Sequence, residues 1–90
     1  GVWNDIKLHI KWSPDPTVGF IEFWYNGVRQ TFTGAPCANQ TRCYVRTMIP
    51  GDRGVYFKQG LYRDNNSTTT GIIYEDGFSA ATTEAGLQPL

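Results

Sequence analysis

The chain has 90 residues, enough for one domain with a modest core. Its formal net charge is zero, which argues against whole-molecule attraction to nucleic acid or to an anionic membrane. The sequence has no apolar run of about 18 residues and so predicts no membrane-spanning helix. We therefore expect neither a nucleic acid nor a membrane as partner.

The first expected strand covers residues 3–12, where apolar and polar residues alternate with period 2. Its apolar residues would face a core, and Lys7, His9 and Lys11 would form a cationic outer face. Lys7 and Lys11 are read either as a solvated strand face or as a track for a polyanion. The tryptophans are expected in the core, with a role as sugar platforms as the alternative: Trp3, Trp12 and Trp24.

Two further strands are expected after a proline-containing loop. Residues 19–25 are aromatic and β-prone, and Asn26-Gly27 predicts a type I′ turn into a strand over 28–32. The turn at Asn26-Gly27 gives the clearest hairpin pattern in the sequence. A further short strand, over 44–48, is expected to follow a polar loop.

The stretch 54–64 alternates two kinds of side chain. One side would carry a row of polar and aromatic residues around a glycine, namely Tyr56, Lys58, Gly60 and Tyr62. Glycine inside a strand often marks the close approach of a ligand, so this row is a candidate binding surface. An ordinary amphipathic strand with a solvated outer face is the alternative reading.

The last expected strand covers residues 71–75, and the residues after 82 are expected to form a tail. We find no helical periodicity of useful length. The sequence predicts an all-β, antiparallel β-sandwich or concanavalin-like jelly roll over residues 1–82, followed by a tail over 83–90.

The cysteines and the glycosylation motifs indicate an oxidising compartment. Cys37 and Cys43 are too few for a zinc site in a chain with a single histidine, so we expect them to form a disulfide. Three Asn-X-Ser/Thr motifs place acceptor asparagines at Asn39, Asn65 and Asn66. We therefore expect a secreted, extracellular protein.

The remaining reactive groups suit carbohydrate. The sequence contains no phosphate-binding glycine loop and no metal-binding cluster, so we expect no cofactor and no catalytic metal, although a structural calcium ion stays compatible with it. Aromatic faces bind sugar rings, while lysine and arginine bind carboxylate or sulfate. A glycosidase-type carboxylate pair of Glu22 with Glu75 or Asp64 is supported by no motif.

Several motifs together resemble a known family. They are Trp3-Asn4-Asp5, Lys11-Trp12-Ser13, the run from Gly19 to Gly27, the run from Tyr56 to Arg63, and the run from Ile73 to Phe78. In order and spacing they resemble the C-terminal part of the β-jelly-roll polysaccharide lyases, a group that includes heparinase I-like enzymes, glucuronan lyases and jelly-roll alginate lyases.

The resemblance implies β-elimination of an acidic, uronate-containing polysaccharide. The family's tyrosine four residues after the lysine maps onto Tyr62 as catalytic acid or base, and the lysine maps onto Lys58, which would bind the anionic chain. Four residues of strand span about 13 Å, so these two side chains would serve different sugar subsites. Our further candidates for substrate contact are Tyr56, Arg63, Lys11 and His9.

One departure from the family pattern leaves two functions open. The family also uses residues on earlier strands that have no counterpart here, so we expect a C-terminal portion of a lyase, or a further segment or second chain that completes the sheet. The missing strands favour the alternative of a non-catalytic carbohydrate-binding module or lectin. The spacing of Lys58, Gly60 and Tyr62 favours the enzyme.

Overall fold

The computed structural model of the protein describes residues 1–60, 66, 68 and 70–87. The strands that it describes are antiparallel, so the predicted all-β, antiparallel fold class is confirmed. This arrangement is consistent with a β-sandwich or jelly-roll domain. Among the described residues, no helix is long and apolar enough to cross a membrane.

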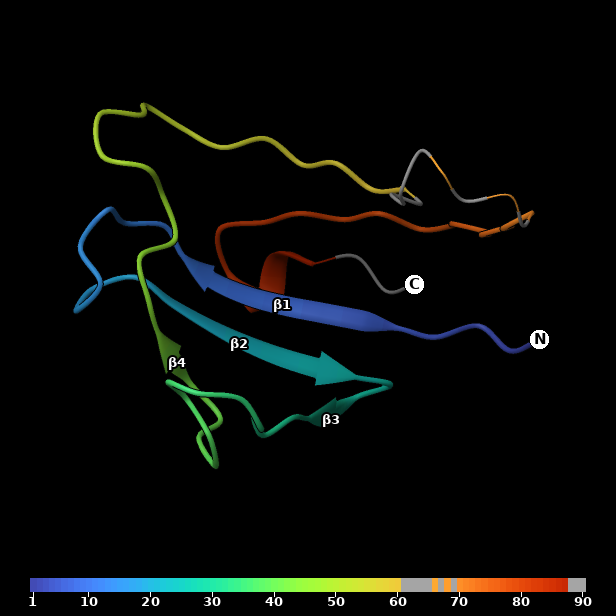
Figure 1. Ribbon diagram of the computed structural model, residues 1–90, viewed down its shortest axis with the longest axis horizontal. Coiled ribbons are helices and arrows are strands. Elements are labelled where there is room, and N and C mark those ends of the chain that lie inside the picture. Colours follow the sequence, from blue (N-terminus) through green and yellow to red (C-terminus); the bar gives the residue numbers. More distant parts are fainter. Residues whose placement is uncertain (61–65, 67, 69, 88–90) are drawn as a thin grey trace. The chain divides into compact units, whose positions relative to one another are not determined.

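The chain divides into two units, Gly1–Val55 and Tyr56–Leu90, and the first contains a four-stranded sheet. Its strands are β1 (Ile6–Lys11), β2 (Phe20–Tyr25), β3 (Val28–Arg29) and β4 (Cys43–Tyr44). β1 lies along one edge of β2, and β3 and β4 both lie along the other edge (Figure 1). β4 pairs with the beginning of β2 and β3 with its end, so the middle of β2 lies between the two short strands.

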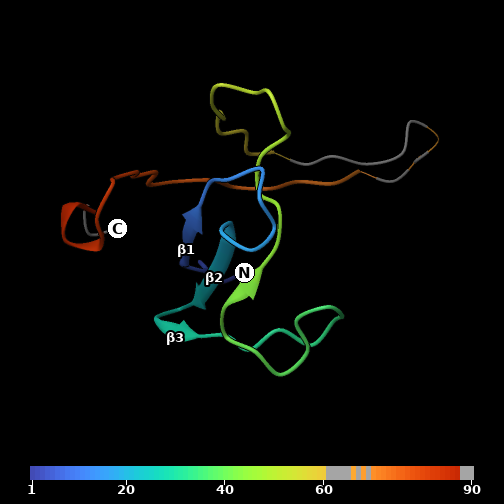
Figure 2. The same cartoon turned by 90° about the vertical axis from the view of Figure 1, so that its left-hand side faces the viewer.

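The hairpin between β2 and β3 forms as the sequence predicts. Asn26 and Gly27 have φ angles of 48° and 81°, the left-handed values that a type I′ turn requires. β3 ends at Arg29, earlier than expected, because the backbone of Phe32 pairs with Asn39 and Gln40 instead of continuing along β2. The chain between β3 and β4 therefore leaves the sheet as a loop, which Figure 2 shows extending away from both strands.

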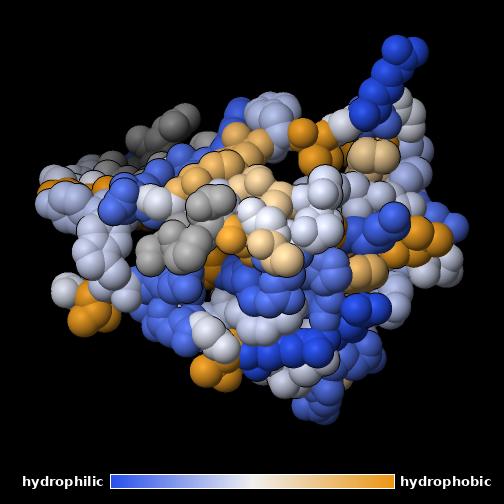
Figure 3. Space-filling model, turned by 180° about the vertical axis from the view of Figure 1, so that it is seen from behind, coloured by the Kyte–Doolittle hydropathy of each residue, from blue (hydrophilic) through white to orange (hydrophobic). Residues whose placement is uncertain are grey.

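The prediction of a buried apolar face on β1 is wrong for the described residues. Ile6 is 57% exposed and Leu8 52% exposed. Trp3 and Trp12, expected in the core, are also exposed, while Trp24 is half-buried. On the side seen in Figure 3, most hydrophobic residues lie in separate groups between hydrophilic ones.

The segment after β4 packs its backbone against the loop before β2. The Thr47 hydroxyl accepts a hydrogen bond from the Ser13 amide at 2.8 Å and donates to the Lys11 carbonyl at 2.6 Å. The Val45 amide donates to the Gly19 carbonyl at 3.0 Å. The expected strand over 44–48 thus exists as β4 plus a segment that bonds to loop backbone.

The second unit is described in part. The described residues 54–60 and 71–75, where the sequence predicts strands, form no strand. Because a strand is defined by its ladder partner, a period-2 pattern alone does not produce one. The unit contains a short 3-10 helix, η1 (Glu84–Gly86), and a stacked pair of rings, Phe57 and Phe78, whose centroids are 4.2 Å apart.

Candidate functional site

The candidate site is one face of the sheet, here called the cationic face. Residues that are directly opposite in antiparallel strands point to the same side of a sheet. The strand register therefore gathers Lys7, His9, Lys11, Phe20, Glu22, Trp24, Arg29 and Tyr44 on this face, and Arg42 joins them from the position before β4. Among the residues of the four described strands, Glu22 is the one acid.

Glu22 is the centre of this face. Glu22 lies opposite His9 in β1 and is only 3% exposed. Arg29 donates a hydrogen bond to Oε2, and Nη2 of Arg42 donates one to Oε1 at 3.1 Å. A buried carboxylate is costly unless it is paired and hydrogen-bonded, and three neighbouring chain segments supply those partners here.

His9 contacts the same carboxylate and is oriented by it. Its Nδ1 lies 2.7 Å from Oε1 of Glu22. An ionised carboxylate only accepts hydrogen bonds, so Nδ1 carries the proton and donates. The imidazole is 56% exposed, which leaves its other nitrogen at the surface.

Electrostatic conditions keep the Glu22 carboxyl ionised. Burial by itself raises its pKa, but the hydrogen bonds from His9 and Arg42 and the charges of Arg42 and Arg29 outweigh burial, so the pKa lies below the ordinary value. The pKa of Arg42 is raised by its contact with the Tyr44 hydroxyl and by Glu22. The cluster therefore holds one negative charge among permanent positive charges near neutral pH.

Aromatic rings hold several of the cations. The Lys7 ammonium lies 4.5 Å from the centre of the Trp24 ring, and the Arg29 guanidinium lies 5.6 Å from the same ring. The Arg42 guanidinium lies 4.2 Å from the centre of the Phe20 ring. Cation–π contacts of this kind fix the position of long side chains that would otherwise move freely.

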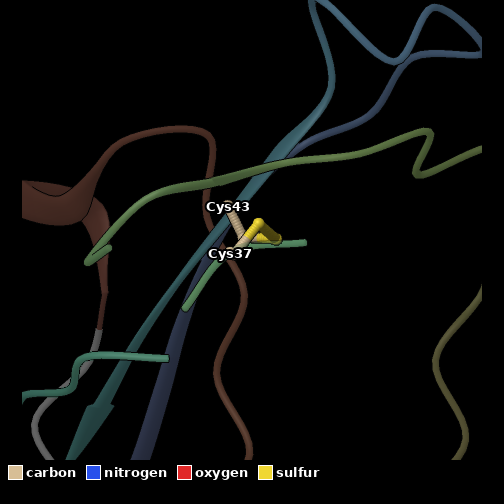
Figure 4. The surroundings of a disulfide bond; sticks show 2 residues. All are labelled: Cys37 and Cys43. Carbon is tan, nitrogen blue, oxygen red and sulfur yellow. A yellow bond between two sulfur atoms is a disulfide. The ribbon is translucent and has the colours of Figure 1, made fainter. Parts of the chain in front are cut away.

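A disulfide anchors the segment that carries Arg42. Cys37 and Cys43 are joined, as the sequence predicts, with a Cα–Cα distance of 5.3 Å (Figure 4). Cys43 belongs to β4 and is opposite Ile21 in β2. Arg42 therefore directly precedes a residue that is both cross-linked and paired with β2, which limits how far it can move from Glu22.

A comparison with protein families decides what kind of domain this is. A family model described as polysaccharide lyase matches residues 1–79. The chain belongs to this polysaccharide lyase family. Comparisons with curated proteins and with solved structures gave no significant match. The resemblance is confirmed at the level of the family, and the heparinase, glucuronan or alginate lyase subgroup stays a prediction.

The lyase family match includes both the cationic face and the predicted Lys58 motif. In the second unit, the Lys58 ammonium lies 5.3 Å from the centre of the Tyr56 ring. The predicted row of Tyr56, Lys58, Gly60 and Tyr62 stays a prediction. Tyr62 and Arg63, the other candidates of this motif, lie outside the described residues.

The structure brings two predicted candidates together and adds residues that the prediction missed. His9 and Lys11 lie on the cationic face of the lyase domain, as expected for β1. Sequence reasoning did not name Arg29 and Arg42 as site residues, and it considered Glu22 only for a carboxylate pair that no motif supports. One signal was available: Glu22 is an acid within the otherwise aromatic and apolar run of β2.

The predicted modification and metal sites stand as follows. Asn39 is exposed in the disulfide-closed loop, Asn66 is described and exposed, and Asn65 lies outside the described residues. In the part of the chain that the structure describes, no cluster of three or more histidine, cysteine or acidic residues could hold a metal ion.

Proposed function

We propose that the protein is a secreted polysaccharide lyase domain that cleaves a uronate-containing polysaccharide by β-elimination. The observation that carries the proposal is a cationic, aromatic sheet face in a chain that belongs to the polysaccharide lyase family. Such a face combines the two kinds of group that bind an acidic sugar chain: cations for its carboxylates and rings for its sugars.

β-Elimination at a uronate needs three groups. One neutralises the carboxylate, one removes the C5 proton, and one protonates the leaving glycosidic oxygen as the C4–O bond breaks and the C4–C5 double bond forms. We assign acid or base chemistry to Tyr62, as the family resemblance implies. A phenol has a pKa near 10, so Tyr62 needs a neighbouring cation to act as base near neutral pH. The scheme needs no cofactor.

Substrate contacts are proposed for each unit separately. Lys58, already in contact with the Tyr56 ring, offers an ammonium beside an aromatic surface, as an acidic sugar requires. Lys11 and His9 offer further contacts from β1, and Arg63 completes the proposed set. An acidic polysaccharide is therefore the proposed partner.

Secretion is supported by the disulfide and by one exposed glycosylation motif. A disulfide between Cys37 and Cys43 persists in oxidising compartments and is rare in the cytosol. Asn39 is exposed in the loop that this disulfide closes, where an attached glycan would meet no packed side chain.

We further propose that additional strands complete the sheet, from another segment or a second copy of the chain. The support is the exposed apolar side of β1 and β3, where Ile6, Leu8 and Val28 are each more than half exposed. Sheet faces of this kind are normally covered by a second layer.

A non-catalytic carbohydrate-binding module is the second candidate. The observation in its favour is that the described residues of the cationic face come from the strands and from the position before β4, within the first unit. A module would keep the binding of acidic sugars and lack the elimination.

An absorbance assay separates the two candidates. Incubation with glucuronan, alginate or heparin should produce the ultraviolet absorbance of an unsaturated uronate with the wild-type chain. Tyr62→Phe should reduce this rate by about 100-fold or more, because it removes the proton-transferring hydroxyl. Tyr74→Phe, a change at an exposed tyrosine of the same unit, is the matched control and should leave the rate unchanged. Binding without absorbance would establish the module instead.

A further inference from the structure

Two guanidinium groups converge on the one buried carboxylate of the cationic face. Arg29 belongs to β3 and Arg42 precedes β4, so they reach Glu22 from two points along the same edge of β2. Arg29 donates to Oε2 and Arg42 to Oε1. The carboxylate therefore fixes two arginines that the chain places thirteen residues apart.

Both arginines keep a surface that a ligand can reach. Their side chains are 43% and 42% exposed, whereas the side chain of Glu22 is 4% exposed. A guanidinium has five N–H donors in a fixed fork, more than the contacts to Glu22 and to the Tyr44 hydroxyl require. The arginines thus bond inward through Glu22 and present further donors outward.

An aromatic ring contacts each of the two guanidinium groups. Arg29 lies over Trp24 and Arg42 over Phe20. A guanidinium that is both hydrogen-bonded and stacked loses less side-chain entropy when it binds a ligand. This is the arrangement of a preorganised anion site.

The charges of the cluster also favour the binding of an anion. One carboxylate neutralises one guanidinium, and the cluster contains two guanidinium groups. The excess positive charge lies where the arginines are exposed. An external carboxylate or sulfate would complete the balance with charge-assisted, bidentate hydrogen bonds.

We propose that Glu22 is a positioning residue that holds Arg29 and Arg42 as a subsite for one anionic group of the polysaccharide, the carboxylate of a uronate or a sulfate ester. The inference rests on the proposed function, since it adds to the lyase domain a specific place for the acidic chain.

The direction in which Glu22→Gln changes the affinity distinguishes a positioning role of Glu22 from a purely long-range electrostatic one. Glu22→Gln removes a negative charge from a face that binds a polyanion, so long-range attraction alone would make binding tighter. If Glu22 positions the arginines, the same change weakens binding, because the amide keeps one accepting oxygen and turns an NH2 donor toward the other guanidinium. The expected loss is about tenfold in affinity.

Binding should be measured in the Tyr62→Phe background by calorimetry, so that no probe is cleaved. The probes are a glucuronan oligosaccharide, a heparin oligosaccharide of equal length and a neutral glucan oligosaccharide. Arg29→Lys and Arg42→Lys keep the positive charge but lose the forked donors of the guanidinium group. Each should weaken binding by about tenfold. Arg46→Lys, the same exchange at an exposed arginine after β4, should have no effect.

The two acidic probes identify the anion. Loss confined to the heparin oligosaccharide assigns the subsite to sulfate, and an equal loss with glucuronan assigns it to the uronate carboxylate. In the active background, Glu22→Gln should raise KM while kcat changes less, as expected for a group that acts only through binding. Circular dichroism checks the fold, and if Glu22→Gln does not fold, the two lysine variants decide.

Two results would overturn the subsite: tighter binding by Glu22→Gln, or equal behaviour of all three Arg→Lys variants. The outcome is separable from that of the proposed function. If the wild-type chain forms no unsaturated product but Arg29→Lys and Arg42→Lys still weaken sugar binding, the catalytic proposal fails and the subsite stands.

Discussion

Glu22 carries the clearest pH dependence of any described residue. Its pKa lies below the ordinary value of 4.5 because its partners outweigh burial, so the unfolded state takes up the proton first. The stability that this carboxylate contributes is fully present above its unfolded pKa and is lost as pH falls through the lower folded value. Acid should therefore destabilise the protein through this residue.

We predict that the stability difference between wild type and Glu22→Gln changes with pH. The free energy of unfolding in urea should fall more steeply for wild type than for Glu22→Gln as the pH falls below the ordinary carboxyl pKa of 4.5. Asp15 also has a lowered pKa, through hydrogen bonds from Thr17, and it titrates in both proteins. Parallel curves for the two proteins would contradict the pairing of Glu22 with its cations.

Gly19 is the residue at which a single methyl group should matter most. A Cβ atom there would lie 2.5 Å from the Val45 carbonyl oxygen and 2.8 Å from the Thr47 hydroxyl oxygen, so the backbone must shift. Gly19→Ala should lower the free energy of unfolding by about 2 kcal/mol.

Gly34→Ala is the matched control, because a Cβ atom there meets nothing within 4 Å. It should be neutral or slightly stabilising, since alanine restricts the unfolded chain. Urea unfolding of both variants measures the difference. Equal stabilities would show that the segment after β4 does not pack closely on Gly19.

Among the elements, the loop between Cys37 and Cys43 links stability to the proposed subsite. Replacing both cysteines by serine opens a ring with a sequence separation of 6. The loss of cross-link entropy should destabilise the fold by about 2 to 3 kcal/mol. Because Arg42 is next to Cys43, affinity for an acidic oligosaccharide should fall as well, by about threefold or more.

Thermal unfolding and calorimetry of the double Cys→Ser variant test both effects. Arg42→Lys with the disulfide intact separates them, since it should lose affinity and keep stability. A double serine variant with unchanged affinity would show that β4 alone holds Arg42 in place.

Sequence reasoning worked best for the elements whose signals are local. β1 and β2 follow from alternation and aromatic content, and the turn at Asn26-Gly27 follows from the need for two positive φ angles. The disulfide follows from there being two cysteines and few other metal ligands.

The missed features depend on partners that are distant in the sequence. The length of β3 is set by Phe32 pairing with the disulfide loop, and the stretch 54–60 shows alternation without a ladder partner. Arg29 and Arg42 meet at Glu22 only because two short strands share one edge of β2. Periodicity carries no information about such an edge.

At the scale of the whole molecule, we propose that this chain, a member of the polysaccharide lyase family, acts on an acidic polysaccharide by elimination. Elimination and hydrolysis cleave the same glycosidic bond and differ in their products. Elimination leaves an unsaturated uronate at the new non-reducing end, and the products together lack the water molecule that hydrolysis adds.

Mass spectrometry of the products from a defined glucuronan oligosaccharide is the most direct test of this claim. The account predicts fragments whose non-reducing ends are one water lighter than hydrolysis fragments, formed by wild type and lost in Tyr62→Phe. Fragments of hydrolytic mass, or unsaturated fragments formed equally by Tyr62→Phe, would contradict it.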